Sequence, residues 1–145
     1  MNVKIFAFAA ACVICGCTPS GTSSAPEQSP ALEGRWEITD VVLNDSVRAM
    51  PAEITPGTKQ YIVFSPDSTY SVRTNCNSIG GSYTLNGDSL TIGDGFCTEM
   101  ACDNMVVEDL IKQILPEVRT AVAGNDSTMR LNTAGESYIS LRKAE

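Results

Sequence analysis

Residues 69–93 read TYSVRTNCNSIGGSYTLNGDSLTIG, and the pattern in this stretch decides the fold class. Apolar and polar side chains alternate in "TYSVRTNC", "GSYTL" and "SLTIG", which is typical of strands that bury one face. In the first of these, Tyr70, Val72 and Cys76 fall on one face of the expected strand. The Asn86-Gly87 pair predicts a tight hairpin between the other two, because both residue types tolerate positive φ.

The same alternation continues on both sides of this stretch. It is found in "RWEITDVVLN", "QYIVFS", "EVRTAVA", "TMRLN" and "SYISLRK", and residues typical of turns lie between these segments. In the first of them, Trp36, Ile38 and Val42 are expected on one face of a strand. Together with residues 69–93, the pattern predicts about eight strands.

One segment, "NMVVEDLIKQILPEV", has its apolar residues at helical spacing instead. Asp103 or Asn104 can cap its start, and Pro116 ends it because the residue before a proline disfavours the α region. The chain is therefore predicted to be mainly β (α+β). About eight antiparallel strands form a small barrel or half-barrel, with one helix inserted between strands five and six.

The first 31 residues have the composition of a targeting segment and a linker. Lys4 precedes ten apolar residues, 5–14, which are too few for a span of about 20 residues and fit a secretory signal. "ICGC", residues 14–17, resembles the lipobox of bacterial lipoproteins; the alternative is an ordinary signal with incidental cysteines. We predict a lipoprotein signal peptide at 1–16, lipidated Cys17 with a flexible tether at 17–31, and one domain at 32–145.

This leader predicts a cell-envelope protein that a lipid anchors to a membrane. Because no acidic run follows Cys17, the default is the outer membrane, with the domain facing the periplasm. The chain has 10 Lys and Arg against 17 Asp and Glu, a net charge of −7. That balance argues against nucleic acid as a partner and against a polybasic patch for membranes. Arg35, Arg73 and Arg119 are interpreted as solvated rather than as one anion site.

Histidine is absent from the sequence, and this narrows the chemistry that the chain can perform. A serine or cysteine nucleophile usually needs a histidine base, and structural zinc usually needs histidine or a fourth cysteine. The carboxylate pairs Glu99 with Asp103 and Glu108 with Asp109 are interpreted as solvated surface and as charge at a helix N-terminus. We expect no catalytic, cofactor or metal site, and no enzyme.

Asp-Ser occurs four times, each time in an expected turn and before Val, Thr or Leu. These triplets resemble the acceptor of an O-glycosylation system found in some Gram-negative envelopes. The alternative is turn chemistry alone, since Asp and Ser side chains bond to the local backbone. The candidate acceptors are Ser46, Ser68, Ser89 and Ser127.

Four segments together resemble the META/HslJ domain family, over about residues 32–142. They are "LEGRWEI", "CNSIGGSY" with its Cys-Asn…Gly-x-Tyr pattern, "TEMAC" with Thr-x-Met-x-Cys, and "MRLNTAGESYISLRK". The resemblance implies a small β-rich domain of envelope or secreted proteins, linked in bacteria to heat-shock response and antibiotic tolerance. It implies no catalytic residues. Cys97 departs from the family pattern.

With Cys17 lipidated, three cysteines remain in an oxidising compartment. Chain entropy favours a long loop: about 3.5 kcal/mol for Cys76–Cys102 against about 2 kcal/mol for Cys97–Cys102. Cys76–Cys97 is nearly as long and stays a competitor on this ground. The resemblance favours Cys76–Cys102, because both lie in family motifs; Cys97 is then expected to be a free, mostly buried thiol.

Three functions follow from these features. The first is a non-enzymatic, lipid-anchored envelope protein that supports envelope integrity or stress tolerance by binding another envelope protein. The second is a lipocalin-like carrier of a small molecule. The third is an inhibitor of an envelope protease that uses "FCTEMAC" as a constrained loop. A carrier needs a hollow barrel, whereas in so short a domain we expect the interior to be filled by Trp36, Tyr61, Phe64, Tyr70 and Tyr83.

Overall fold

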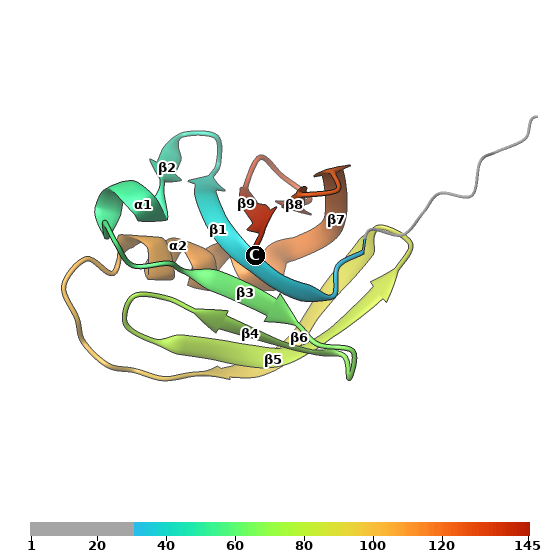
Figure 1. The fold of residues 1–145 in the computed structure, drawn as a ribbon, viewed down its shortest axis with the longest axis horizontal. Helices are drawn as coiled ribbons and strands as arrows, with labels where there is room; N and C mark the ends of the chain where they lie inside the picture. The colour runs from blue at the N-terminus through green and yellow to red at the C-terminus, as the bar shows by residue number, and fades with distance from the viewer. Residues whose placement is uncertain (1–30) are drawn as a thin grey trace, which may run out of the picture.

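Antiparallel strands make up most of the computed structural model, which describes residues 31–145 (Figure 1). The predicted signal peptide, Cys17 and all of the predicted tether except Ala31 lie outside the described residues. The described strands are β1 (Gly34–Leu43), β2 (Val47–Ala49), β3 (Tyr61–Phe64), β4 (Thr69–Arg73), β5 (Ser78–Asn86), β6 (Ser89–Cys97), β7 (Val118–Asn125), β8 (Thr128–Thr133) and β9 (Tyr138–Lys143). The helices are α1 (Pro51–Ile54), α2 (Val106–Ile114) and the short 3₁₀ helix η1 (Leu115–Glu117).

Eight of these strands close into an antiparallel barrel. The order is β1-β3-β4-β5-β6-β7-β8-β9, and β9 pairs back onto β1. The extra strand β2 pairs with the second half of β1, at residues 41–43, while β3 pairs with its first half, at residues 34–37. Closure leaves few exposed edges. The predicted barrel of about eight strands, with a helix between the fifth and sixth predicted strands, is confirmed.

The pairing is thinnest between β6 and β7. Ser89 pairs with Thr120, and the amide of Ala121 donates to the carbonyl of Asp88 at 2.8 Å. Beyond Ser89, β6 continues to Cys97 with β5 as its partner. η1 packs against β6. α2 packs against β1 and β9, and it passes behind β1 in the view of Figure 1. The helical segment between β6 and β7 therefore contacts β1, β6 and β9 of the barrel.

One core fills the barrel. Four aromatic side chains, Trp36, Phe64, Tyr70 and Tyr83, are at most 7% exposed, and the Phe64 and Tyr83 rings meet edge to face with centroids 5.1 Å apart. The apolar face of α2 enters the same core with Val107, Leu110, Ile111 and Ile114. Tyr61, which was grouped with the interior aromatics, instead lies outside, under the guanidinium of Arg35.

A β-bulge in β1 makes one prediction about its faces wrong. The register against β9 shifts between Ile38 and Asp40. A bulge adds one residue to the strand. The residues that face the core are therefore even-numbered before the bulge and odd-numbered after it. Trp36 and Ile38 face the core as predicted, but beyond the bulge it is Val41, and not Val42, that joins the core cluster.

The predicted cap of the main helix is also wrong. Met105 occupies the N-cap position of α2, and no side chain caps it. The backbone carbonyls of Asp103 and Asn104 instead accept hydrogen bonds from the side-chain amide of Asn75, both at 3.3 Å. Asn75, which follows β4, thus holds this turn in place, and the helix begins only after the turn. Pro116 lies in η1, directly after α2, as its predicted role as a terminator requires.

Candidate functional site

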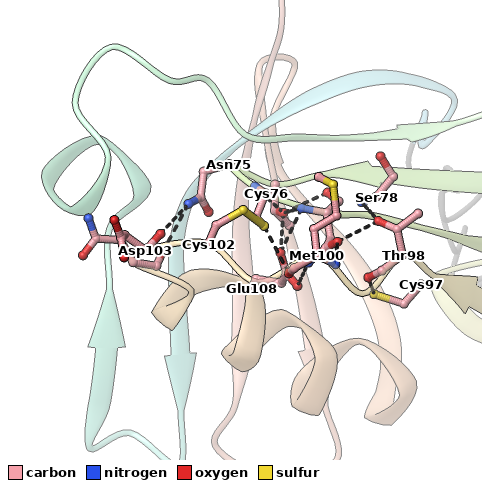
Figure 2. Close-up of a disulfide and its surroundings, with 12 residues drawn as sticks. Asn75, Cys76, Ser78, Cys97, Thr98, Met100, Cys102, Asp103 and Glu108 are labelled. Atoms are coloured by element: carbon pink, nitrogen blue, oxygen red, sulfur yellow. Dashed lines mark hydrogen bonds between the residues drawn. A yellow bond between two sulfur atoms is a disulfide. The ribbon is translucent and has the colours of Figure 1, made fainter.

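The structure contains a disulfide between Cys76 and Cys102 (Figure 2). Cys76 lies in the turn between β4 and β5, and Cys102 lies in the segment between β6 and α2; their Cα atoms are 5.9 Å apart. The bond thus ties the segment before the helix to the barrel. Cys97 is outside the bond, at the end of β6.

Beside the disulfide, the amide side chain of Asn77 satisfies every one of its polar atoms. Its Oδ1 accepts from the Thr98 hydroxyl and from the Met100 amide, both at 2.8 Å. Its Nδ2 donates to the Met100 carbonyl at 3.0 Å and to Glu108 Oε1 at 2.8 Å. Asn77 itself is 1% exposed, so these bonds satisfy polar atoms that water does not reach. One side chain thereby links the turn, the segment 98–100 and the helix.

Glu108 is the anion at the centre of this network, and it is fully buried. Oε1 accepts from Asn77 Nδ2 and forms an ion pair with Lys112, one helical turn on, at 2.7 Å. Oε2 accepts from the Thr74 hydroxyl at 2.7 Å and from the backbone N–H of Asn77 at 3.1 Å. Two donors on each oxygen fill the carboxylate's capacity as an acceptor.

These contacts fix the charge of Glu108. Burial by itself would raise the pKa of its carboxyl, but the hydrogen bonds from Lys112, Thr74 and Asn77 oppose that effect, and the pKa lies below its ordinary value. Lys112, bonded to the same carboxylate, has a raised pKa. A general acid or base needs a pKa near the working pH and a free path to substrate. A saturated, buried carboxylate has neither, so this cluster holds structure together.

We call this set the clasp, and it comprises Thr74, Cys76, Asn77, Thr98, Met100, Cys102, Glu108 and Lys112. The family-like motifs "CNSIGGSY" and "TEMAC" both contribute to it, which gives their spacing a physical reason. The clasp joins a turn, an irregular segment and a helix of nine residues, which would be too short to be stable in isolation.

The clasp segment, residues 96–106, exposes large apolar side chains. Phe96 is 64% exposed, Met100 58% and Val106 51%. Among residues 31–145, only two other large hydrophobics, Val47 and Val122, are exposed to a comparable degree. Three of the five exposed large hydrophobic residues of this range therefore lie in the segment that the clasp holds.

The expectation that Phe96 marks a core-facing, mostly buried thiol at Cys97 is only partly right. Neighbouring residues of a strand face opposite sides. The Phe96 ring lies outside, over Gly80, where its carbons would come within 2.9 Å of an added Cβ. Cys97 points the other way, packs against the core and is half-buried. Its thiol donates to the Thr98 carbonyl at 3.0 Å.

The other candidate residues are dispersed. Ser46, Ser68, Ser89 and Ser127 are all exposed, in or beside hairpin turns. Arg35, Arg73 and Arg119 do not converge. Arg35 stacks on Tyr61, Arg73 reaches Ser78, and Arg119 reaches Glu117 and nearby carbonyls.

Of the carboxylate pairs, Glu108 and Asp109 separate, because Asp109 is exposed while Glu108 is buried; the solvated interpretation of Glu108 is wrong. Glu99 and Asp103 are exposed, as that interpretation expects. Within residues 31–145, no group of three or more potential metal ligands gathers. The helices of this part are all too short or too polar to cross a membrane.

Sequence reasoning missed Glu108, Thr74 and Asn77 as a unit. One signal was available: Glu108 and Lys112 are four residues apart, and Glu108 directly follows Val107 on the apolar side of the helix. The partners on the other side come from a turn 31 to 34 residues earlier, and no local pattern identifies them.

Comparison with known proteins supports the same fold. An NMR structure of a protein from Burkholderia xenovorans aligns with 89% of this chain and 98% of its own, with a TM-score of 0.65 and 18% identity. A crystal structure of a DUF4847 family protein from Bacteroides vulgatus aligns with 78% of this chain and 94% of its own, with a TM-score of 0.55 and 14% identity. At these identities the likeness concerns the fold alone.

No curated protein matches the chain. Neither the solved neighbours nor the family description indicates an enzymatic activity. The model of the META domain, however, matches residues 30–145, which include the whole barrel, α2 and every member of the clasp. The chain therefore belongs to the META domain family.

Proposed function

We propose that this chain is a non-enzymatic, lipid-anchored protein of the cell envelope that supports envelope integrity or stress tolerance by binding another envelope protein. Lipidated Cys17 anchors it, on this proposal, to the outer membrane, with the domain in the periplasm. The lipobox-like "ICGC" supports the anchor. The META domain supplies a rigid barrel from which contacts are made.

The clasp segment is the observation that carries the binding role. Phe96, Met100 and Val106 are exposed, yet the backbone between them is fixed by the disulfide and by Asn77. A preorganised segment loses less conformational entropy on binding than a flexible one. Exposed large apolar side chains that are held in place are typical of a protein-binding surface.

The carrier alternative receives less support. Four of its five aromatic residues fill the barrel rather than line a space, and they pack with Leu90, Leu131 and Ile139 in one cluster. The protease-inhibitor alternative shares the clasp segment with our proposal and is one specific case of it. It differs in its partner, which would be a protease.

Deletion of the gene, followed by complementation, tests the proposed role. Cells that lack the protein are expected to lose viability under heat or detergent, and the wild-type chain should restore it. Met100→Ser removes one exposed apolar side chain of the clasp segment without touching the Asn77 contacts, which use the Met100 backbone. We expect this variant to complement poorly while it accumulates normally.

Val122→Ser is the matched control, since Val122 is 45% exposed on β7 and lies outside the clasp segment. It should complement fully. Equal complementation by both variants would count against the clasp segment as the binding surface. Absence of any deletion phenotype under heat, detergent and osmotic stress would count against the envelope role itself.

A further inference from the structure

A groove of about 740 Å³ on the barrel gathers much of the positive charge of an acidic protein. Four of the nine Lys and Arg residues of the range 31–145 line it, against two of the sixteen Asp and Glu residues of the same range. The four are Arg35, Lys59, Arg142 and Lys143. The negative net charge of the whole chain therefore coexists with a locally cationic groove.

Two of these cations have no carboxylate partner among the described residues. The Arg35 guanidinium lies 3.7 Å from the centroid of the Tyr61 ring. Stacking occupies the flat face of a guanidinium and leaves its N–H edge free to bind an anion. Lys143 Nζ lies 4.5 Å from the Trp36 ring centroid and donates to the carbonyl of Glu33 at 3.1 Å. An ammonium has three donors, so two remain.

One of the two acidic residues that line the groove, Glu37, is already neutralised by ion pairs. Glu37 accepts from Arg142 at 3.1 Å and is paired with Lys59 at 3.8 Å. These pairs hold the groove's shape and cancel the charge that would repel an anion. The second acidic lining residue, Glu145, leaves the set of side chains with an excess of two positive charges.

The groove also lies where the chain enters the barrel. Lys143 contacts the backbone of Glu33, directly before β1, and Arg35 is the second residue of β1. A tether from a membrane anchor at Cys17 would therefore join the barrel at a point beside this groove. The 18 residues from Cys17 to Gly34 extend to about 60 Å at most, so the anchor permits contact with the membrane but does not enforce it.

We propose that this groove binds the phosphate groups of anionic phospholipids and thereby seats the barrel on the membrane that carries its anchor. Outside the groove, residues 31–145 carry five Lys and Arg residues against fourteen Asp and Glu residues, so an anionic membrane favours the approach of the groove face. Each cation near an anionic surface contributes enough that its loss weakens the contact by about fivefold. The inference rests on the proposed lipid anchor, and its test separates the two.

Lysine footprinting on the full chain provides the test. The chain is purified in detergent, reconstituted into phosphatidylglycerol or phosphatidylcholine vesicles, and acetylated with a soluble reagent. In phosphatidylglycerol, Lys59 and Lys143 should react several-fold more slowly than in phosphatidylcholine. Lys112 should not change, because it lies outside the groove, in the clasp. Equal rates for Lys59 and Lys143 in the two lipids would overturn the proposal.

Arg35→Gln is expected to reduce the phosphatidylglycerol protection of Lys143 by about fivefold. Arg130→Gln is its matched control, since Arg130 stacks on Tyr138 at 3.4 Å outside the groove. Equal loss of protection in the two variants would contradict the groove.

Two further arms identify other occupants. If inorganic phosphate fully protects the lysines in phosphatidylcholine vesicles, the groove is a site for free phosphate. If polyglutamate protects them and phosphatidylglycerol does not, the groove is a site for an acidic protein. Either result overturns the proposal that the groove binds phospholipid. Flotation of the same vesicles reports the anchor separately: a chain that floats without groove protection refutes the groove alone, and a chain that does not float refutes the anchor.

Discussion

The clasp makes a quantitative prediction through Glu108→Gln. The substitution keeps the shape of the side chain but removes its charge, and with it the ion pair to Lys112. One of the two carboxylate oxygens is replaced by an NH₂ group, which turns two of the four accepted hydrogen bonds into opposed donors.

The expected cost is worked from burial. Removing one partner of a buried ion pair costs about 3–5 kcal/mol. Lys112 is one-third exposed and can turn to water, so the low end, about 3 kcal/mol, applies. For a domain near 115 residues, a loss of 1 kcal/mol lowers the melting temperature by about 4 °C. Glu108→Gln should therefore unfold about 12 °C below the wild type.

Thermal unfolding at pH 7, followed by far-ultraviolet circular dichroism without reductant, measures this shift. Glu117→Gln is the matched control, because it removes the same charge from an exposed pair with Arg119. Exposed pairs contribute at most about 1 kcal/mol, so that variant should stay within about 4 °C of the wild type.

The pH dependence gives a second readout. The pKa of Glu108 is lowered from its ordinary value of 4.5, so its contribution is complete above that value and is lost as pH falls through the pKa of the folded state. The gap between wild type and Glu108→Gln should therefore be full at pH 7 and shrink below pH 4.5. A variant that melts within 2 °C of the wild type at pH 7, or a gap independent of pH, would refute the clasp as a stabilising unit.

Three further predictions concern covalent chemistry. Non-reducing peptide mapping after alkylation should yield a peptide that joins Cys76 to Cys102, with Cys97 alkylated; a dominant peptide containing Cys97 would show another pairing. Cys17→Ala should abolish incorporation of a radioactive fatty acid and leave the precursor unprocessed, and label retained on the variant would refute the anchor. If the Asp-Ser turns are glycan acceptors, intact-mass measurement of protein from its own host should show hexose-sized additions on Ser46, Ser68, Ser89 or Ser127, whereas the unglycosylated mass alone would leave them as plain turns.

The strands and their turns were predictable because they depend on local pattern. The hairpin predicted at Asn86-Gly87 does form between β5 and β6, but its two loop residues are Gly87 and Asp88, because Asn86 pairs with Ser89. Of the predicted pair only Gly87 has a positive φ, 63°, at the first loop position, which favours glycine. The apolar spacing of residues 106–114 likewise fixed both the helix and its buried face. Each of these signals is complete within a window of about ten residues.

The predictions about individual side chains failed where residues distant in sequence determine the local structure. The bulge after Ile38 is visible only against β9, a strand about 100 residues away, and it determines which valine faces the core. Glutamate is a residue type that usually lies at the surface, and the burial of Glu108 depends on hydrogen bonds from the turn at Thr74–Asn77 as well as on the nearby Lys112. Arg35 and Lys143 lie near opposite ends of the domain's sequence. They line the same groove only because β9 pairs with β1.

Photo-crosslinking in living cells tests the central claim most directly, namely that the clasp segment binds another envelope protein. A photoreactive amino acid is placed at Met100 or, as the control, at Val122, both about half exposed. The account predicts a discrete protein adduct from position 100 and none from position 122. The same adduct from both positions, or no adduct from position 100 under envelope stress, would contradict it.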